Sequence, residues 1–130
     1  MSRIRFSPEH IESLQPDEIF VFGSNAQGWH GGGAAADARR WFGAVWGEGI
    51  GRTGQCYAIP TTGGDVEKIR PYVEQFIAYA EAHPELTFLV TAIGCGIARR
   101  TPEEIAPLFA KALDMPNVLL PRRFVEHLLS

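Results

Sequence analysis

The sequence has few of the residues that build metal sites or disulfide frameworks. Of its 130 residues only two are cysteine, Cys56 and Cys95, and four are scattered histidines. The cysteines lie in different segments and form no CxxC pair, so a zinc site is disfavoured and reduced thiols in a cytosolic protein are expected. We therefore expect neither a metal ion nor a cofactor.

Long basic runs and long apolar runs are also missing. No run of Lys and Arg exceeds two residues, and the formal net charge is -3; both disfavour nucleic acid as the principal partner. No segment reaches the roughly 18 consecutive apolar residues of a membrane span. The first ten residues lack the apolar core of a signal peptide. A cytoplasmic protein with no membrane partner is expected, and its oligomeric state is left open.

The length and composition are those of one globular domain over residues 1–130. Such a chain can bury a core without disulfides, and its 45% hydrophobic and 21% charged residues are ordinary values. No linker or repeat divides it. Most of the 14 glycines lie between Gly23 and Gly54, interleaved with segments of strand-like and helix-like sequence. This crowding indicates loops with special backbone requirements.

Hydrophobic patterning predicts strands that alternate with helices. Strands are expected at residues 18–22, 55–59, 87–93 and 117–120, and helices at 8–14, 34–45, 66–80, 101–113 and 122–129. Ser7 is the predicted N-cap of the first helix, and Pro71 marks a kink or a late start in the third. No regular structure is assigned to residues 47–54. Because the strands are unbroken apolar runs, a mostly parallel sheet with helices on both faces is expected.

Two glycine clusters each follow a predicted strand and precede a predicted helix. They are residues 31–33 and the Gly-Cys-Gly at 94–96. Ligands of open α/β sheets bind beyond the carboxyl ends of the strands, and the free N-H groups at a helix start attract phosphate. The two loops could therefore grip a diphosphate, although tight chain reversal alone also explains such glycines. Neither cluster matches a Walker motif.

Both segments resemble the ligand loops of macrodomains. FGSNAQGWHGGGAAADA, at residues 22–38, is similar to their first loop, and TAIGCGIARRTPEE, at 91–104, to their phosphate-cradling second loop. From Glu18 onward the chain resembles a compact, divergent macrodomain of bacterial or phage type. The resemblance implies a three-layer α/β/α sandwich that binds ADP-ribose or a related NAD-derived nucleotide metabolite. Some members also hydrolyse ADP-ribosyl linkages.

The resemblance also assigns candidate site residues. Asn25 matches the asparagine that contacts the distal ribose. Ala35 stands where one large class of hydrolytic macrodomains has an aspartate, and Asp37 is the candidate replacement, so the catalytic candidates are Asn25 and Asp37. The implied ligand-binding residues are Gly23, Ser24, Asn25, His30, Gly31, Gly32, Gly33, Gly94, Cys95, Gly96, Ile97 and Ala98. The partner would be ADP-ribose, free or attached to a protein or nucleic acid.

Two other classes of function remain open from the sequence. A thiol at a helix start has its thiolate stabilised, so Cys95 is a candidate nucleophile, although no His or Asp partner is identifiable beside it. A non-catalytic interaction module would instead use an exposed apolar patch that includes tryptophans. Replacing Cys95 with alanine should abolish thiol-dependent activity but should leave ADP-ribose binding intact.

Overall fold

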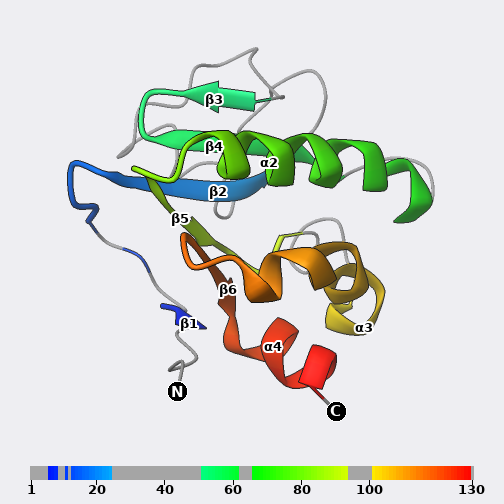
Figure 1. The fold of residues 1–130 in the computed structure, drawn as a ribbon. Coiled ribbons are helices and arrows are strands. Elements are labelled where there is room, and N and C mark those ends of the chain that lie inside the picture. Colours follow the sequence, from blue (N-terminus) through cyan, green and yellow to red (C-terminus); the bar gives the residue numbers. More distant parts are fainter. Residues whose placement is uncertain are drawn as a thin grey trace.

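The computed structural model describes residues 6–8, 11, 13–24, 51–61, 66–93 and 101–129, which form an α/β fold around a mixed six-stranded sheet (Figure 1). The spatial order of the strands is β1 (Phe6–Ser7), β6 (Val118–Pro121), β5 (Thr87–Val90), β2 (Glu18–Ser24), β4 (Cys56–Pro60) and β3 (Gly51–Thr53). All neighbouring strands are parallel except β3 and β4. The predicted mostly parallel sheet is confirmed.

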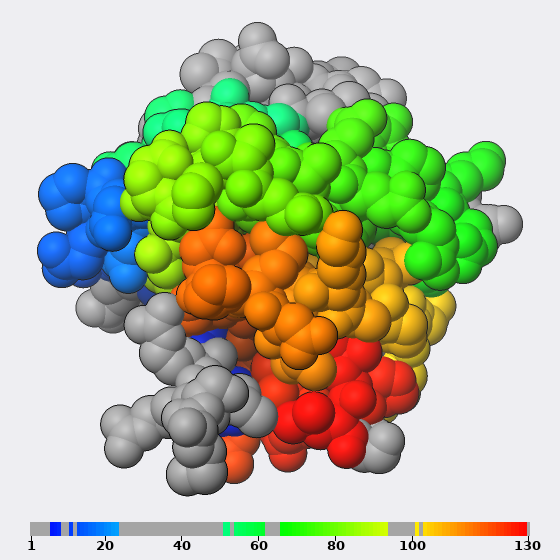
Figure 2. Space-filling view, in the orientation of Figure 1, coloured from blue at the N-terminus to red at the C-terminus, as the bar shows by residue number. Residues whose placement is uncertain are grey.

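The described helices cover one face of the sheet, which we call the helix face. They are η1 (Val66–Lys68), α2 (Arg70–Ala82), α3 (Pro102–Ile105), η2 (Ala106–Asp114) and α4 (Arg122–Leu129). Their buried side chains join one hydrophobic cluster with residues of β2, β4, β5 and β6. Figure 2 shows α2, η2 and α4 following one another down this face. Helices were expected on both faces, and the helix predicted at 34–45 lies outside the described residues.

Alternating side chains of the central strand β2 enter two separate clusters. Ile19 and Val21 point to the helix face and are fully buried. Phe20 and Phe22 lie in the second cluster, on the opposite face of the sheet, where at most 3% of each residue is exposed. Because neighbouring side chains of a strand point to opposite faces, β2 is covered on both sides. This explains why its sequence is a continuous apolar run.

Several predicted elements agree with the structure to within a few residues. The strand predicted at 18–22 extends to Ser24, those at 55–59 and 117–120 are each displaced by one residue, and the one at 87–93 ends at Val90. The terminal helix at 122–129 is confirmed. The late start marked by Pro71 is also confirmed, because α2 begins at Arg70 with proline in its first turn.

Two predictions near the sheet edges are wrong. Ser7 does not cap a helix: it belongs to β1, and residues 8, 11 and 13–15 are not helical. Residues 51–53 form the edge strand β3, which joins β4 through a two-residue turn at Gly54-Gln55. Gly51 and Gly54 have φ values of 84° and 56°, a region that glycine enters without steric cost. The glycines therefore mark the two ends of a short strand, which the sequence did not predict.

The sequence Thr-Pro-Glu-Glu at residues 101–104 is a capping-box pattern, which the structure confirms, but the helix that follows is not a regular α-helix. The Glu104 N-H donates to Thr101 Oγ1 at 3.3 Å, and the Thr101 N-H donates to Glu104 Oε1 at 3.0 Å. The α-helix α3 ends at Ile105, and a 3-10 helix, η2, continues to Asp114. Pro107 stands at the change, where it supplies no N-H for an α-helical hydrogen bond.

Candidate functional site

The carboxyl ends of β2 and β5 lie side by side, and both glycine clusters follow these two strands in the sequence. β2 and β5 are parallel neighbours with Val21 opposite Val90. After β2 the next parallel strand, β4, lies on one side of β2, whereas after β5 the chain continues to β6 on the other side. The chain connections that leave β2 and β5 therefore run to opposite sides of the sheet. Such a switch point is where open α/β sheets bind ligands.

A threonine joins the last residues of β5 to β2. The carbonyl oxygen of Val21 accepts hydrogen bonds from the N-H of Thr91 at 3.0 Å and from its Oγ1 at 2.9 Å. The N-H of Ile93 then donates to the Thr91 carbonyl at 2.7 Å, the pattern of a three-residue γ-turn. Ile93 is 2% exposed. The chain thus turns sharply out of the sheet immediately before residue 94, with its direction set by a buried side chain.

A serine hydroxyl completes the hydrogen bonding at the same edge. The Phe88 N-H donates to the Asn117 carbonyl, and continuing this parallel register places residue 121 as the donor to the Val90 carbonyl. Residue 121 is proline and has no N-H. Ser7 Oγ donates to the Val90 carbonyl instead, at 2.6 Å, and Ser7 is only 4% exposed. β1 therefore supplies the donor that β6 lacks.

The structure describes only the beginning of the predicted site. Gly23 and Ser24 form the end of β2, where they pair with Ile59 and Pro60. The other predicted site residues lie outside the described residues; they are Asn25, His30, Gly31, Gly32, Gly33, Asp37, Gly94, Cys95, Gly96, Ile97 and Ala98.

Sequence reasoning missed three hydroxyl residues at this edge of the sheet: Ser7, Thr91 and Thr61. Thr61 directly follows β4 and is 3% exposed. A polar residue just after an apolar strand was a usable signal for Thr61 and Thr91. No local signal identified Ser7, because its acceptor lies 83 residues away in the sequence.

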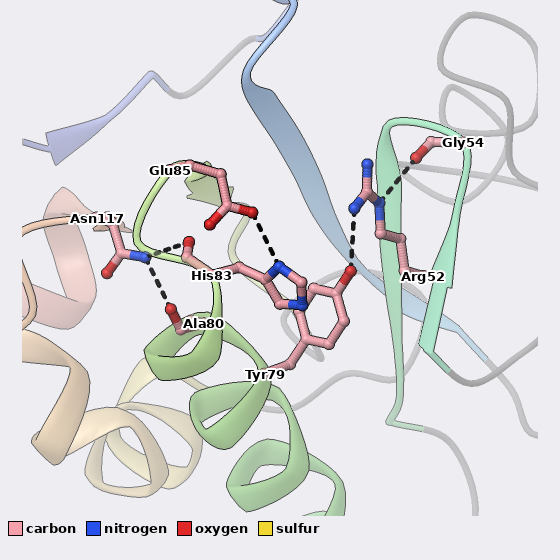
Figure 3. A network of polar contacts seen from close by, with 7 residues as sticks. All are labelled: Arg52, Gly54, Tyr79, Ala80, His83, Glu85 and Asn117. Atoms are coloured by element: carbon pink, nitrogen blue, oxygen red, sulfur yellow. Dashed lines mark hydrogen bonds and ion pairs between the residues drawn. The ribbon is translucent and has the colours of Figure 1, made fainter.

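A second polar network lies at the opposite edge of the sheet, where α2 ends and β5 begins (Figure 3). The Arg52 guanidinium donates to the Tyr79 hydroxyl at 3.0 Å and to the Gly54 carbonyl at 3.2 Å. The Tyr79 ring packs on the His83 ring with centroids 4.3 Å apart, and His83 Nδ1 lies 3.0 Å from Glu85 Oε2. The bond from Arg52 to Tyr79 therefore ties the β3–β4 hairpin to α2, and His83 and Glu85 continue the network at the end of that helix.

The charges of this network stabilise one another. The hydrogen bond from His83 lowers the pKa of the Glu85 carboxyl, and the positive charge of Arg52 contributes in the same direction. Burial raises the pKa of the Tyr57 hydroxyl, with a further contribution from the neighbouring Tyr79. The network lies at the end of the sheet opposite the carboxyl ends of β2 and β5, where the Arg52–Tyr79 bond joins β3 to α2.

The end of α2 is fixed to the start of β6 by one amide. Asn117 Nδ2 donates to the Ala80 carbonyl at 2.9 Å and to the His83 carbonyl at 3.2 Å (Figure 3). Both carbonyls also accept a backbone N-H, that of His83 at 3.2 Å and that of Leu86 at 3.1 Å, so the Asn117 amide adds a second donor from the start of the next strand. This contact holds the end of α2 beside the sheet.

Among the described residues, no group of three or more His, Cys, Asp or Glu side chains is placed to hold a metal ion. Within the same ranges, every helix is too short or too polar to cross a membrane. Comparison with family models, with curated proteins and with solved structures finds no match for the chain. Function is therefore inferred from the residues and the topology.

Proposed function

We propose that the protein binds ADP-ribose, or a related NAD-derived nucleotide metabolite, between two glycine-rich loops that follow β2 and β5. The observation that carries the proposal is the switch point between these strands. These strands are neighbours in space although they lie about 70 residues apart in the sequence, and a glycine-rich segment follows each of them in the chain. A diphosphate bound there would meet backbone N-H groups from both segments.

The burial of the sheet supports a three-layer, macrodomain-like architecture. Phe22 and Cys56 are fully buried on the face opposite the helices, and Ala58 is 1% exposed. The described apolar side chains that pack against this cluster are only half-buried themselves, namely Ile11 and Leu14. A face so apolar requires a cover from the same chain or from a partner. The helix predicted at 34–45 would supply the third layer.

Within this proposal Asn25 holds the distal ribose, and the glycines around it allow close approach of the phosphates. If turnover occurs, Asn25 and the substrate's own phosphate would position the water that attacks the anomeric carbon or its ester. Asp37 is the candidate for the acidic group, since Ala35 has no ionisable side chain. Binding is the primary claim, and hydrolysis is a second step that uses the same residues.

Isothermal titration with ADP-ribose tests the proposal. We expect heat of binding from the native protein, a loss of affinity in Asn25→Ala, and unchanged affinity in Gln75→Ala. Gln75 is an exposed residue of α2 and serves as the matched amide control. Cys95→Ala should retain binding, because only the backbone N-H of that residue is required. Absence of heat and of a thermal shift at millimolar ADP-ribose would refute the proposal.

A further inference from the structure

The nine-residue 3-10 helix η2 is unusual, because 3-10 runs longer than three or four residues are uncommon and often mark a hinge or strain. Its hydrogen bonding persists to the end, where the Met115 N-H donates to the Ala112 carbonyl at 3.0 Å. The segment is well packed: Ala106, Phe109 and Ala112 are fully buried. The 3-10 helix is thus part of the folded core, although its hydrogen-bond geometry is less favourable than that of an α-helix.

The burial pattern of this segment follows the period of an α-helix better than that of a 3-10 helix. At 3 residues per turn, the buried Ile105 and Leu108 would share one row with the exposed Lys111 and Asp114. At 3.6 residues per turn, the buried and exposed positions separate onto two halves of the helix. An α-helical form would therefore place the buried side chains on one face.

Pro107 is the residue that disfavours the α-helical form. In a continuous α-helix from Pro102 to Asp114, Pro107 would lie in the interior, where its ring clashes with the carbonyl of residue 103 and one hydrogen bond is lost. In the observed structure it stands in the first turn of η2, where no N-H is required. The side-chain pattern and the proline thus favour different backbones.

We propose that residues 102–114 switch between the observed arrangement, in which the α-helix α3 is followed by the 3-10 helix η2, and one continuous α-helix. Nine residues shorten by about 4 to 5 Å in this conversion, because the rise per residue falls from about 2.0 to 1.5 Å. The far end is fixed, since Asn117 is bonded to α2 and β6 pairs with β5. The shortening therefore moves Thr101, the first described residue after 94–100.

The cost of the interior proline sets the population of the second state that the test requires. An interior proline disfavours an α-helix by a factor on the order of 100. For a Pro107→Ala variant to be mainly α-helical, the native protein must populate that form at roughly 1% or more. Minor states of this size exchange with the major state on a timescale that NMR relaxation dispersion detects.

The experiment uses the full chain with ¹⁵N and ¹³C labels. The native protein is expected to show relaxation dispersion at the backbone N-H groups of residues 105, 106 and 108–114. Pro107→Ala should lose the 3-10 pattern of Hα–HN contacts between residues i and i+2, and should gain the i to i+4 contacts of an α-helix. Pro116→Ala is the control, because Pro116 is exposed and lies beyond η2; it should keep the native pattern.

Either of two results overturns the proposal: a flat dispersion profile in the native protein, or a folded Pro107→Ala variant that keeps the 3-10 pattern. If Pro107→Ala does not fold, the dispersion of the native protein decides alone. Exchange confined to residues 105–114 then supports the switch, and its absence refutes it.

Discussion

The hydrogen bond between Ser7 and Val90 leads to a quantitative prediction for Ser7→Ala. The variant removes the only described donor to a buried carbonyl for which residue 121 supplies no N-H. Leaving a buried acceptor unpaired costs about 1 to 3 kcal/mol, a large part of the roughly 5 to 15 kcal/mol by which small domains are stable. We expect the free energy of unfolding in urea to fall by this amount, with no change in the denaturant slope.

Two further variants separate this cause from a general effect of losing a hydroxyl. Thr91→Val also deletes a hydroxyl bonded to a strand carbonyl, but the Val21 carbonyl still accepts the Thr91 N-H, so the cost should stay below about 1 kcal/mol. Pro121→Ala restores an N-H opposite Val90. In the Pro121→Ala variant, Ser7→Ala should lower the free energy of unfolding by at least about 1 kcal/mol less than it does in the native protein. A double-mutant cycle measures this difference.

The reasoning on Ser7 is refuted by either of two results. One is a Ser7→Ala variant whose stability lies within about 0.5 kcal/mol of the native protein, the range of an ordinary surface substitution. The other is additivity of Ser7→Ala and Pro121→Ala, which would mean that the Val90 carbonyl does not connect the two sites.

Three other predictions concern the polar network and the edge strand β3. Asn117→Ala removes the amide donor from the Ala80 and His83 carbonyls. Each carbonyl keeps a backbone donor, the N-H of His83 or of Leu86, so the variant should cost about 0.5 to 1.5 kcal/mol in urea unfolding. Gly51→Ala meets no atom within 4 Å but places alanine at a φ of 84°, so about 1 to 2 kcal/mol of backbone strain is expected. Glu85→Gln should weaken the acid dependence of stability, measured as the free energy of unfolding against pH.

The sign of the Glu85 effect follows from its lowered pKa. A carboxyl with a pKa below its ordinary 4.5 stabilises the fold above that pH, and the contribution is lost as the pH falls through the folded-state value. Native protein should therefore lose stability below about pH 4.5, and Glu85→Gln should lose less. The same loss of stability below pH 4.5 in the native protein and in Glu85→Gln would contradict the role given to Glu85.

A second variant tests the strain at Gly51. Asparagine tolerates positive φ, so a Gly51→Asn variant that is as unstable as Gly51→Ala would contradict backbone strain as the cause.

Local signals in the sequence predicted the elements whose stability is local. The capping box of Thr101 and Glu104 uses residues three apart, and the apolar run of β2 reflects burial on both faces. Ser7 followed by proline is an equally good local signal for a helix start, yet it is wrong. There the hydroxyl has a buried acceptor in β5 that requires it, and a long-range hydrogen bond outweighs a cap on the protein surface.

The candidate site was only partly predictable, because a site of this kind depends on the order of strands. The sequence shows that a glycine cluster follows each of two strands, but it does not show that β5 is the neighbour of β2 rather than of β4. That order is set by packing between segments about 70 residues apart. The η2 conformation was missed for a related reason: the side-chain period indicates an α-helix, and the backbone departs from it at Pro107.

Different contacts hold the two ends of the sheet, so a variant at one end can test stability separately from the proposed binding at the other. At one end, side chains of Arg52, Tyr79, His83 and Glu85 bond to one another. At the other, hydroxyl groups satisfy strand carbonyls just before the glycine segments begin. Tyr79→Phe removes the acceptor of the Arg52 N-H at 3.0 Å but keeps the aromatic ring.

This variant should therefore cost about 0.5 to 1.5 kcal/mol of stability and leave the Kd for ADP-ribose unchanged at a temperature where it is fully folded. Urea unfolding and calorimetric titration on the same preparation measure the two quantities. Because Asn25→Ala should show the reverse behaviour, the pair distinguishes the two edges. A Tyr79→Phe variant that weakens ADP-ribose binding as much as Asn25→Ala would show that the ligand does not bind at the carboxyl ends of β2 and β5.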